Sequence, residues 1–305
     1  MEERPLVPEA SCRGSRHAPS SDLLASARND SVEAGPQLIW PWSTGADDCC
    51  CFAVPISDAA SQLRANDVCG IRIPPQLKHA SEKRKAEFLA GRRCAGMALK
   101  HLGGKTDFPG ISSDRSPHWP VGYTGSISHT RNMAVSLVGR SEKYPGLGVD
   151  LEKILTGNEA EKLADLIMKP QERRCIAGLD FALLTTLVFS AKESLFKALY
   201  PAVKHICAFG ASEFTGWDDC GFARLRLATD LSPCWSSGHV FTIQFSVLGD
   251  HLLTMVALPA RPAKPSPPYA EPARNRSFER SPNSVAPAVL SFSRCLNPTH
   301  TNRCG

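Results

Sequence analysis

The clearest chemical pattern in the sequence is a pair of carboxylates, Asp150 and Glu152, within the run Gly-Val-Asp-Leu-Glu that begins at Gly148. Residues two apart on a strand project from the same face, so both carboxylates face one way. Two acids on one face repel each other unless a cation lies between them, and Mg²⁺ prefers carboxylate oxygens. Such pairs are also common as solvated groups at strand ends, so this pair alone leaves both interpretations open.

A third carboxylate lies on a strongly apolar segment, residues 181–199, whose pattern predicts a long helix. Glu193 and Lys197 are four residues apart and share a helix face, where they could form an ordinary surface ion pair. An apolar helix is buried on most sides, however, and a polar cluster on it is costly unless it is used. With Asp150 and Glu152, Glu193 would complete an oxygen cage for Mg²⁺ that leaves positions for phosphate oxygens.

A proline- and glycine-rich stretch, residues 117–129, predicts a turn that presents Ser126, Ser128 and His129 just before a strand. Backbone amides and hydroxyls in such a turn can hold a phosphate, and a histidine can donate to it. A single histidine at the start of a strand is more often structural, so the phosphate interpretation depends on the other motifs.

Basic side chains recur on residues 81–102, a segment predicted to be a helix with Ser81 as its N-cap. Arg84 and Arg92 are eight residues apart, about two helical turns, and so lie on roughly one side of the helix. They could bind anionic groups there or form an ordinary solvated basic face.

The remaining hydrophobic patterns predict the elements that must position these groups. We expect strands at residues 51–56, 133–138, 146–151, 223–227, 240–247 and 252–257, and a further helix at residues 159–168. Pro201 is expected to end the helix over residues 181–199. A helix followed by several strands thus occurs twice, which predicts an α+β fold of two similar halves that meet near residue 145.

Composition sets the limits of this fold and narrows the functional class. Residues 1–36 and 260–305 lack hydrophobic periodicity and are expected to be disordered, which leaves 37–145 and 146–259 as the two halves. The last segment holds seven basic and two acidic residues, which account for the whole net charge of +5, so the folded part shows no sign of binding nucleic acid.

The sequence also predicts the compartment. It contains no apolar run of the roughly 20 residues that a membrane helix needs, and its acidic N-terminus is not followed by the apolar stretch of a secretion signal. The twelve cysteines include no Cys-x-x-Cys pair, so they are expected to be reduced and not to hold a metal. We therefore expect a cytoplasmic protein without a membrane span.

Four motifs, taken together and in this order, resemble the 4′-phosphopantetheinyl transferases, and most closely the EntD-like branch that primes siderophore, nonribosomal-peptide and polyketide synthases. They are RKAEFLAGRRCAxxAL at residues 84–99, WPxGxxGSISH at 119–129, GVDLE at 148–152 and FSAKESLFKALYP at 189–201. The resemblance runs from about residue 53 to residue 258. It implies two similar α+β halves in a pseudo-twofold arrangement, with the cofactor in the cleft between them.

The resemblance also implies roles for individual residues. It implies that the ligands of Mg²⁺ are Asp150, Glu152 and Glu193. It implies that coenzyme A is bound by Arg84, Arg92, Ser128, His129, Lys192 and Lys197, with Asp150 contributing through the metal. Arg115 is the candidate for contact with the 3′-phosphate of the cofactor. The implied catalytic residues are Glu193 and Lys197, together with Glu172, which stands where some relatives carry a possible base.

The implied reaction is phosphoryl transfer. A serine hydroxyl of an acyl or peptidyl carrier protein attacks the β-phosphorus of coenzyme A, and adenosine 3′,5′-bisphosphate leaves. Two alternatives stay open at this point: a module that binds coenzyme A or a carrier protein without turnover, and a Mg²⁺-dependent nucleotide phosphohydrolase. A monomer is expected.

Overall fold

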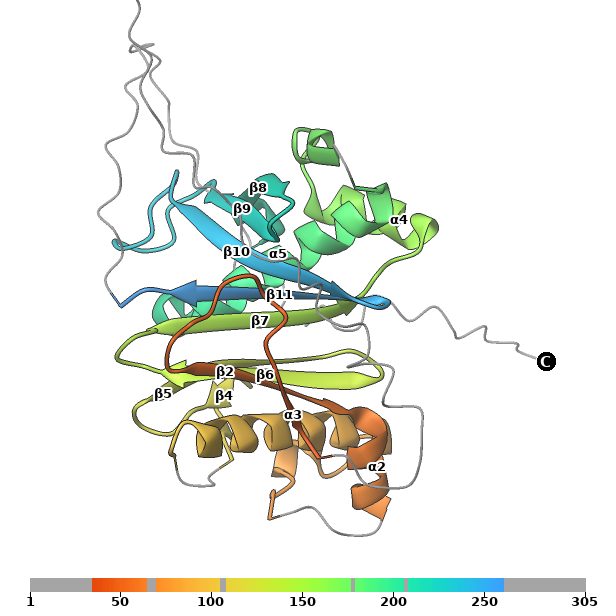
Figure 1. Cartoon of the computed structure of the whole chain (residues 1–305), viewed down its shortest axis with the longest axis vertical. Coiled ribbons are helices and arrows are strands. Elements are labelled where there is room, and N and C mark those ends of the chain that lie inside the picture. Colours follow the sequence, from red (N-terminus) through yellow and green to blue (C-terminus); the bar gives the residue numbers. More distant parts are fainter. Residues whose placement is uncertain (1–34, 65–69, 105–107, 177–178, 206–207, 261–305) are drawn as a thin grey trace, which may run out of the picture. The chain divides into compact units, whose positions relative to one another are not determined.

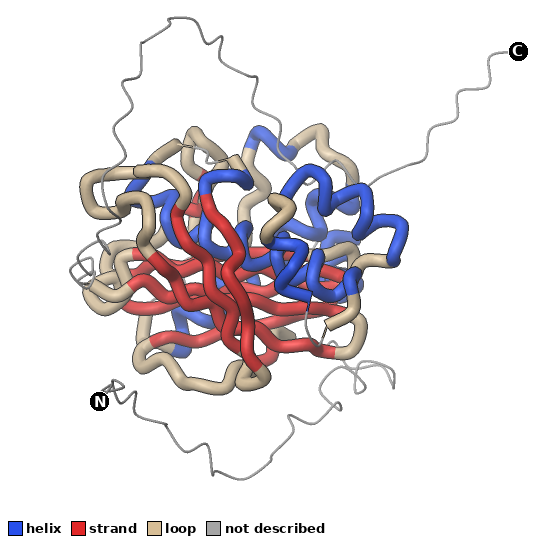
Figure 2. The backbone as a smooth tube through the Cα atoms, turned by 90° about the horizontal axis from the view of Figure 1, so that it is seen from above, coloured by secondary structure: helices blue, strands red, loops and turns tan. Residues whose placement is uncertain are grey.

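A computed structural model describes residues 35–64, 70–104, 108–176, 179–205 and 208–260. The expected disordered segments fall outside these residues, apart from 35, 36 and 260. Within them the chain forms two antiparallel sheets with helices on their outer faces, and Figure 2 shows the strands in the middle with helices on either side. The predicted α+β fold of two halves is confirmed.

The N-terminal half is a four-stranded sheet covered by two helices (Figure 1). The strand order is β1 (Gln37–Ile39), β2 (Cys49–Pro55), β6 (Met133–Arg140) and β5 (Tyr123–His129). The helices are α2 (Ile56–Arg64) and α3 (Glu82–His101), and a small hairpin pairs β3 (Gly110–Ile111) with β4 (Pro117–His118). Residues of α3 pack against β2 and β6, so this helix forms the outer layer.

The C-terminal half is a five-stranded sheet against one long helix. The strand order is β7 (Gly146–Lys153), β11 (His251–Leu258), β10 (Val240–Leu248), β9 (Phe222–Leu227) and β8 (Ser212–Asp218). The helices are α4 (Gly157–Ile167) and α5 (Phe181–Val203), with short 3₁₀ turns at η3 (Glu172–Ile176) and η4 (Phe209–Ala211); a further 3₁₀ turn, η2 (Pro75–Leu77), lies in the N-terminal half. The apolar residues of α5 bury themselves against β7 and β11.

The ends of the two long helices show how well local signals predicted them. The Ser81 side chain accepts a hydrogen bond from the Arg84 amide at 3.2 Å, which confirms Ser81 as the N-cap of α3. Pro201 does not end α5, which continues to Val203 and stops at Lys204 in the left-handed region, with φ 56°. In the last turn a proline removes only one amide donor, and that loss is tolerated because α5 is held by packing.

The segment that the sequence predicted as a turn is largely the strand β5. Its first two residues belong to β4, a turn follows at residues 121–122, and residues from Tyr123 onward pair with β6. The inward-facing positions of β5 are Thr124, Ser126 and Ser128, which are buried but polar, so the strand carries no hydrophobic alternation. The sequence patterns also missed β1, α2, β3, β4 and β8.

Strand β7 separates two environments by simple alternation. Leu147, Val149 and Leu151 point into an apolar core that β2, β6 and β11 also line. The other face of β7 carries Gly146 and Gly148, and a Cβ atom on either would overlap carbonyl oxygens of α5. The two glycines therefore allow α5 to lie directly on β7.

The two halves share this core and belong to one compact unit. The predicted junction near residue 145 lies between β6 and β7, but no linker separates the halves there. Trp42, on the connection from β1 to β2, is buried against the shared core, and the amide of nearby Thr44 donates to the Gln244 side chain of β10 at 3.1 Å. The connection thus covers the core where no helix does.

Replacement of Gly148 by alanine tests the close approach of α5 to β7. The new methyl group would overlap the Ser194 carbonyl oxygen, so α5 must shift. We expect Gly148→Ala to lower the free energy of unfolding by about 1–3 kcal/mol, the usual cost of overpacking. Urea unfolding measures this. Gly157→Ala is the control, because a Cβ there meets no atom within 4 Å. Equal stability of both variants would contradict this account of the packing.

Candidate metal and phosphate site

Asp150 is the central group of the site, at the seam where β5 and β7 lie side by side. Its side chain is almost fully buried. Oδ1 accepts hydrogen bonds from Lys197 Nζ at 2.6 Å and from Ser128 Oγ at 2.9 Å. Oδ2 is also buried but has no hydrogen-bond partner. A buried carboxylate oxygen without a partner is costly, so this atom is suited to accept a cation or a hydrogen-bond donor.

Lys197 reaches this seam from α5. Its ammonium group donates to Asp150 Oδ1, to Ser128 Oγ at 3.1 Å and to the Val149 carbonyl oxygen at 3.2 Å. Burial by itself would lower the pKa of Lys197, but the nearby carboxylates of Asp150 and Glu193 outweigh burial and raise it. The lysine is therefore charged, and it neutralises Asp150 while joining three elements.

Two further carboxylates, those of Glu152 and Glu193, lie close enough to Asp150 and Lys197 to interact with them electrostatically. Burial, together with the charge on Asp150, raises the pKa of Glu193 to about 7. Burial followed by Asp150 and Glu193 raises the pKa of Glu152 to about 9. Three acids therefore share one ammonium group, and in the protein without metal the excess negative charge is relieved by holding protons.

The three carboxylates do not form a metal-binding arrangement in this conformation. In the described residues, no three His, Cys, Asp or Glu side chains are grouped closely enough to hold a metal ion as they stand. The donor set nevertheless fits Mg²⁺: it consists of hard carboxylate oxygens, it lacks positive charge, and Asp150 Oδ2 is buried without a partner. Binding would need side-chain movement of Glu152 and Glu193 toward Asp150.

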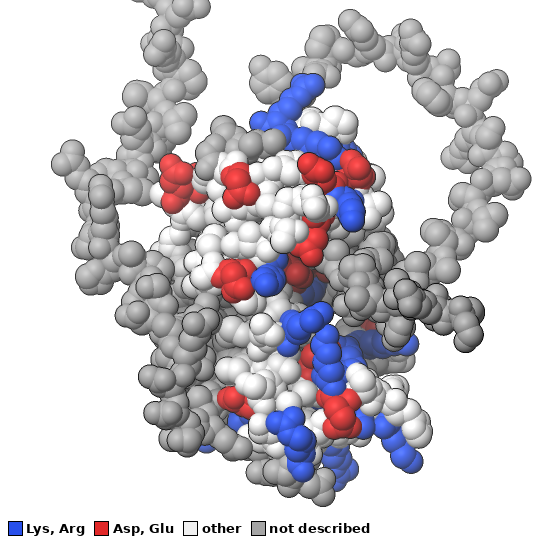
Figure 3. Space-filling view, turned by 90° about the vertical axis from the view of Figure 1, so that its right-hand side faces the viewer, with Lys and Arg blue, Asp and Glu red and all other residues white. Residues whose placement is uncertain are grey.

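A cluster of basic side chains lies beside the carboxylates, between α3 and the end of β5. Arg84 Nη1 is 3.1 Å from Glu87 Oε2 and 3.0 Å from His129 Nε2. Arginine only donates, so Nε2 must accept, and His129 is neutral with its proton on Nδ1. Burial lowers the pKa of His129, and Arg84 and Lys197 add to this effect although Glu87 opposes it. On the face shown in Figure 3, basic side chains gather over the lower part, among acidic ones.

Glu87 is the functional candidate that the sequence analysis missed. It is buried and forms ion pairs with Arg84 and, at 3.8 Å, with Lys83, and its Oε2 lies 3.9 Å from Nε2 of the neutral His129. It therefore sets where the basic groups stand. The i, i+3 spacing from Arg84 was visible in the motif, but a helical pattern cannot show that His129, 42 residues further on, would face the same carboxylate.

Arg92 is a buried cation whose charge is not balanced. Its Nη2 donates to the Gly110 carbonyl oxygen at 3.0 Å, its guanidinium stacks on the Phe88 ring, and its Nε has no partner. Burial, and then repulsion from Arg84, lower the pKa of Arg92 to about 10. It forms no ion pair within the part of the chain that the structure describes. This arrangement suits an incoming anion.

Arg115 lies apart from this cluster. It is exposed in the turn between β3 and β4, in the left-handed region with φ 68°. Its amide donates to the Ser112 carbonyl oxygen. The hairpin is nonetheless tied to the site at both ends, because Arg92 holds Gly110 and the Tyr200 hydroxyl of α5 donates to Asp114 at 3.0 Å.

Lys192 and Glu172 occupy a different place from the one that the resemblance implied. Lys192 Nζ is 2.7 Å from Glu172 Oε1 and donates to the Ile167 carbonyl oxygen at 2.6 Å. Glu172 is fully buried and also accepts from the amides of Phe214 and Lys169. Both groups are engaged in the core of the C-terminal half. This geometry supports a structural pair and argues against cofactor binding by Lys192 and proton abstraction by Glu172.

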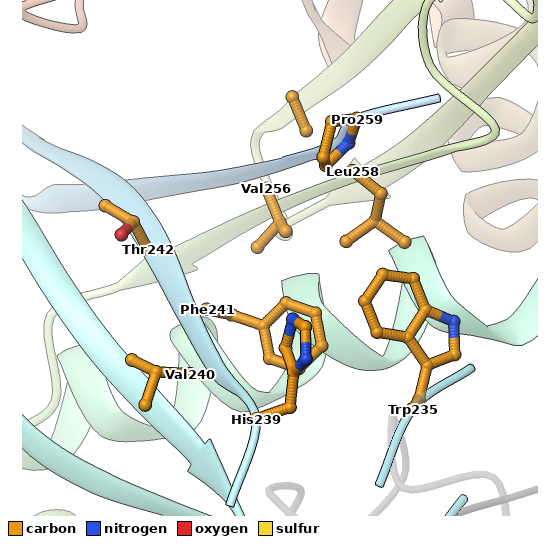
Figure 4. Close-up of a pocket in the computed structure, with 9 residues that line it drawn as sticks. Trp235, His239, Val240, Phe241, Thr242, Val256, Leu258 and Pro259 are labelled. Atoms are coloured by element: carbon orange, nitrogen blue, oxygen red, sulfur yellow. The ribbon is translucent and has the colours of Figure 1, made fainter. Parts of the chain in front are cut away.

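A separate hollow of about 260 Å³ lies at the ends of β10 and β11 (Figure 4). Trp235, His239 and Phe241 stand together on one side of it, with ring centroids 4.7–5.2 Å apart. Val256 and Leu258 complete its apolar lining. None of the described residues that line it carries a carboxylate, so these residues offer none of the chemistry expected of a metal site.

The shared protonation of the carboxylates predicts a pH dependence of stability. The folded protein without metal holds protons on Glu193 and Glu152 that the unfolded chain loses above about pH 4.5. This contribution is full below that pH and is lost as the pH rises through about 7 to about 9. We expect the Glu193→Gln variant, melted in EDTA beside the wild type, to gain in Tm relative to the wild type as the pH rises from about 4.5 to about 7, and this gain to level off at higher pH. Parallel Tm profiles would contradict the raised pKa values.

Comparison with known proteins agrees with this geometry. Residues 74–139 match the 4′-phosphopantetheinyl transferase N-terminal domain, and residues 146–256 match the 4′-phosphopantetheinyl transferase superfamily. Enterobactin synthase component D of Salmonella typhimurium is 41% identical over 141 residues, and that of Escherichia coli K12 is 46% identical over 125 residues. These alignments cover 46% and 40% of this chain, and 58% of each relative, so the chain spans a little over half the length of both.

A longer alignment extends over most of a third relative. The 4′-phosphopantetheinyl transferase Svp of Streptomyces mobaraensis is 32% identical over 170 residues, which are 53% of this chain and 68% of that protein. The first matched region lies within the N-terminal half, the second covers most of the C-terminal half, and together they include the residues around Asp150 described above. The chain therefore belongs to the 4′-phosphopantetheinyl transferase superfamily.

Proposed function

We propose that this protein transfers the 4′-phosphopantetheine group of coenzyme A to a serine of an acyl or peptidyl carrier protein, in a Mg²⁺-dependent reaction. The observation that carries the proposal is the seam at Asp150, where three carboxylates share one ammonium group and Asp150 Oδ2 is buried without a partner. A divalent cation would supply the positive charge that these carboxylates lack, and the basic side chains of Arg84 and Arg92 would bind a pyrophosphate. The three relatives, two synthase components and a transferase, support the same reaction.

The chemistry needs positioning and charge balance more than a covalent intermediate. When bound, Mg²⁺ would be held by Asp150, Glu152 and Glu193 and would neutralise charge on the pyrophosphate. Lys197 holds Asp150 in place and adds a positive charge at the seam. Arg84, Arg92 and His129 bind the anionic end of the cofactor from the side of α3 and β5.

The carrier serine must lose a proton as its oxygen bonds to phosphorus. A carboxylate at the seam takes this proton, the bond from the β-phosphorus to the bridging oxygen breaks, and adenosine 3′,5′-bisphosphate leaves. Glu193 suits this role because it is a carboxylate of the seam on α5, within electrostatic range of the Lys197 ammonium group. Glu172 does not, since it is buried in its pair with Lys192.

One experiment separates this function from its alternatives. The protein is incubated with an apo-carrier protein, Mg²⁺ and coenzyme A, and the carrier is weighed by mass spectrometry. Transfer adds one phosphopantetheine to the carrier. A phosphohydrolase would release nucleotide without changing the carrier, and a binding module would change neither. No helix in the described residues is long and apolar enough to cross a membrane; a cytoplasmic location and a monomeric state stay predictions.

Removal of a single carboxylate should abolish transfer without unfolding the protein. Asp150→Asn and Glu193→Gln keep the shape of each side chain but remove its charge, and we expect the rate at saturating Mg²⁺ to fall by at least about a hundredfold. Glu161→Gln, on the exposed side of α4, is the matched control. Thermal melts show that the variants are folded. A variant at the seam that kept most of its rate would exclude that residue as a metal ligand.

Recognition of the 3′-phosphate can be assigned to one basic residue. The wild type should use coenzyme A better than dephospho-coenzyme A by about 10- to 150-fold, the value of a charge-assisted contact of roughly 1.5–3 kcal/mol. Among Arg84→Ala, Arg92→Lys, Arg115→Ala and His129→Ala, the variant that lacks this contact should lose the preference, and the others should lower both values of kcat/KM together. Lys100→Ala, exposed at the end of α3, is the control. An unchanged ratio in all four variants would place the 3′-phosphate elsewhere.

A further inference from the structure

Two serines on the inward face of β5 approach β7 but meet different groups there. Ser126 Oγ donates to the Val149 backbone carbonyl oxygen at 3.4 Å. Ser128 Oγ, two residues further along the same face, donates to the carboxylate of Asp150 at 2.9 Å. Both serines are buried. The pair therefore offers a natural comparison between a hydroxyl on the backbone and a hydroxyl on the carboxylate.

The hydroxyl of Ser128 cannot donate a second strong hydrogen bond. It gives its single proton to Asp150 Oδ1, and it accepts a hydrogen bond from Lys197 Nζ at 3.1 Å. Lys197 also binds Oδ1 directly. These contacts form a closed triangle of hydroxyl, ammonium and carboxylate oxygen at the seam.

The triangle occupies only one of the two oxygens of Asp150. With Oδ1 held from two directions, the carboxylate plane cannot rotate freely, and Oδ2 stays buried without a partner. A carboxylate held in this way presents one defined oxygen to a cation. Groups that orient a metal-binding carboxylate by hydrogen bonding are typically important for metal affinity even though they do not touch the metal.

We propose that Ser128 is a positioning residue that holds Asp150 so that Oδ2 is available to the divalent cation, a role that rests on the proposed function. This differs from the contact with coenzyme A that the sequence resemblance implied for Ser128. Lys197 alone cannot fix the carboxylate, because a flexible ammonium group is a point charge without directional preference. Ser128 is held in strand β5, and its directional hydrogen bond fixes the orientation of the Asp150 carboxylate.

The test compares Ser128→Ala with Ser126→Ala and measures metal binding separately from activity. Mn²⁺ affinity is measured by electron paramagnetic resonance on the full chain, and coenzyme A affinity by calorimetry in EDTA. We expect Ser128→Ala to weaken Mn²⁺ binding by about 10- to 100-fold, as loss of such a group does elsewhere. Its affinity for coenzyme A without metal should stay within about twofold of the wild type, and Ser126→Ala should change neither value.

A graded variant keeps the test decisive if Ser128→Ala is poorly folded. Ser128→Cys preserves the shape with a weaker donor, so its Mn²⁺ affinity should lie between those of the wild type and Ser128→Ala. Loss of coenzyme A affinity with unchanged Mn²⁺ binding would overturn the proposal in favour of a direct cofactor contact. Absence of Mn²⁺ binding in the wild type would overturn it as well.

The Mn²⁺-binding test of Ser128 and the carrier-modification test of the proposed function can fail independently of each other. If the wild type binds Mn²⁺ and Ser128→Ala weakens that binding, the positioning role holds even where the carrier protein gains no mass. If the carrier protein is modified but both serine variants bind Mn²⁺ as the wild type does, the transferase function holds and the positioning role of Ser128 is wrong.

Discussion

The close contact between α5 and β7 is the constraint on which the site depends. Gly146 and Gly148 leave no side chains between the strand and the helix, so the two backbones touch. Two residues further along the same face of β7, side chains return with Asp150. At that point the helix is near enough for Lys197 to reach the carboxylate, and a thicker interface would separate them. The packing of α5 on Gly146 and Gly148 thus makes the ion pair between Lys197 and Asp150 possible further along β7.

Charge balance explains why the site is poised for a cation. Asp150, Glu152 and Glu193 share a partly buried seam with Lys197, and burial makes each uncompensated negative charge costly. In the protein without metal, this cost raises the pKa values of Glu152 and Glu193. On α3 the imbalance has the opposite sign, since Arg92 is buried and forms no ion pair with the residues that the structure describes. A metal-bound pyrophosphate would correct both imbalances together.

Helix periodicity directs the neighbouring residues Lys192 and Glu193 of α5 into different environments. Successive residues are rotated by about 100°, so Lys192 and Glu193 point in different directions. Lys192 enters the core, where it pairs with Glu172 and anchors η3 and β8 to the helix. Glu193 and Lys197, four residues apart, face the seam. The Lys-Glu motif therefore combines a structural ion pair with a carboxylate of the seam, and loss of one partner from such a buried pair typically costs about 3–5 kcal/mol in stability.

The sequence by itself determined the α+β class, the N-cap of α3, strand β7 with its same-face carboxylates, and the family, because these follow from local periodicity and contiguous motifs. It did not reveal β5 as a strand, since the buried face of β5 is made of Ser and Thr and shows no hydrophobic alternation. Only the tertiary structure decided that Ser128 meets Asp150, that His129 meets Arg84, and that Glu172 pairs with Lys192. Each of these is a contact between elements far apart in sequence, which depends on how sheets and helices pack and not on the pattern within any one of them.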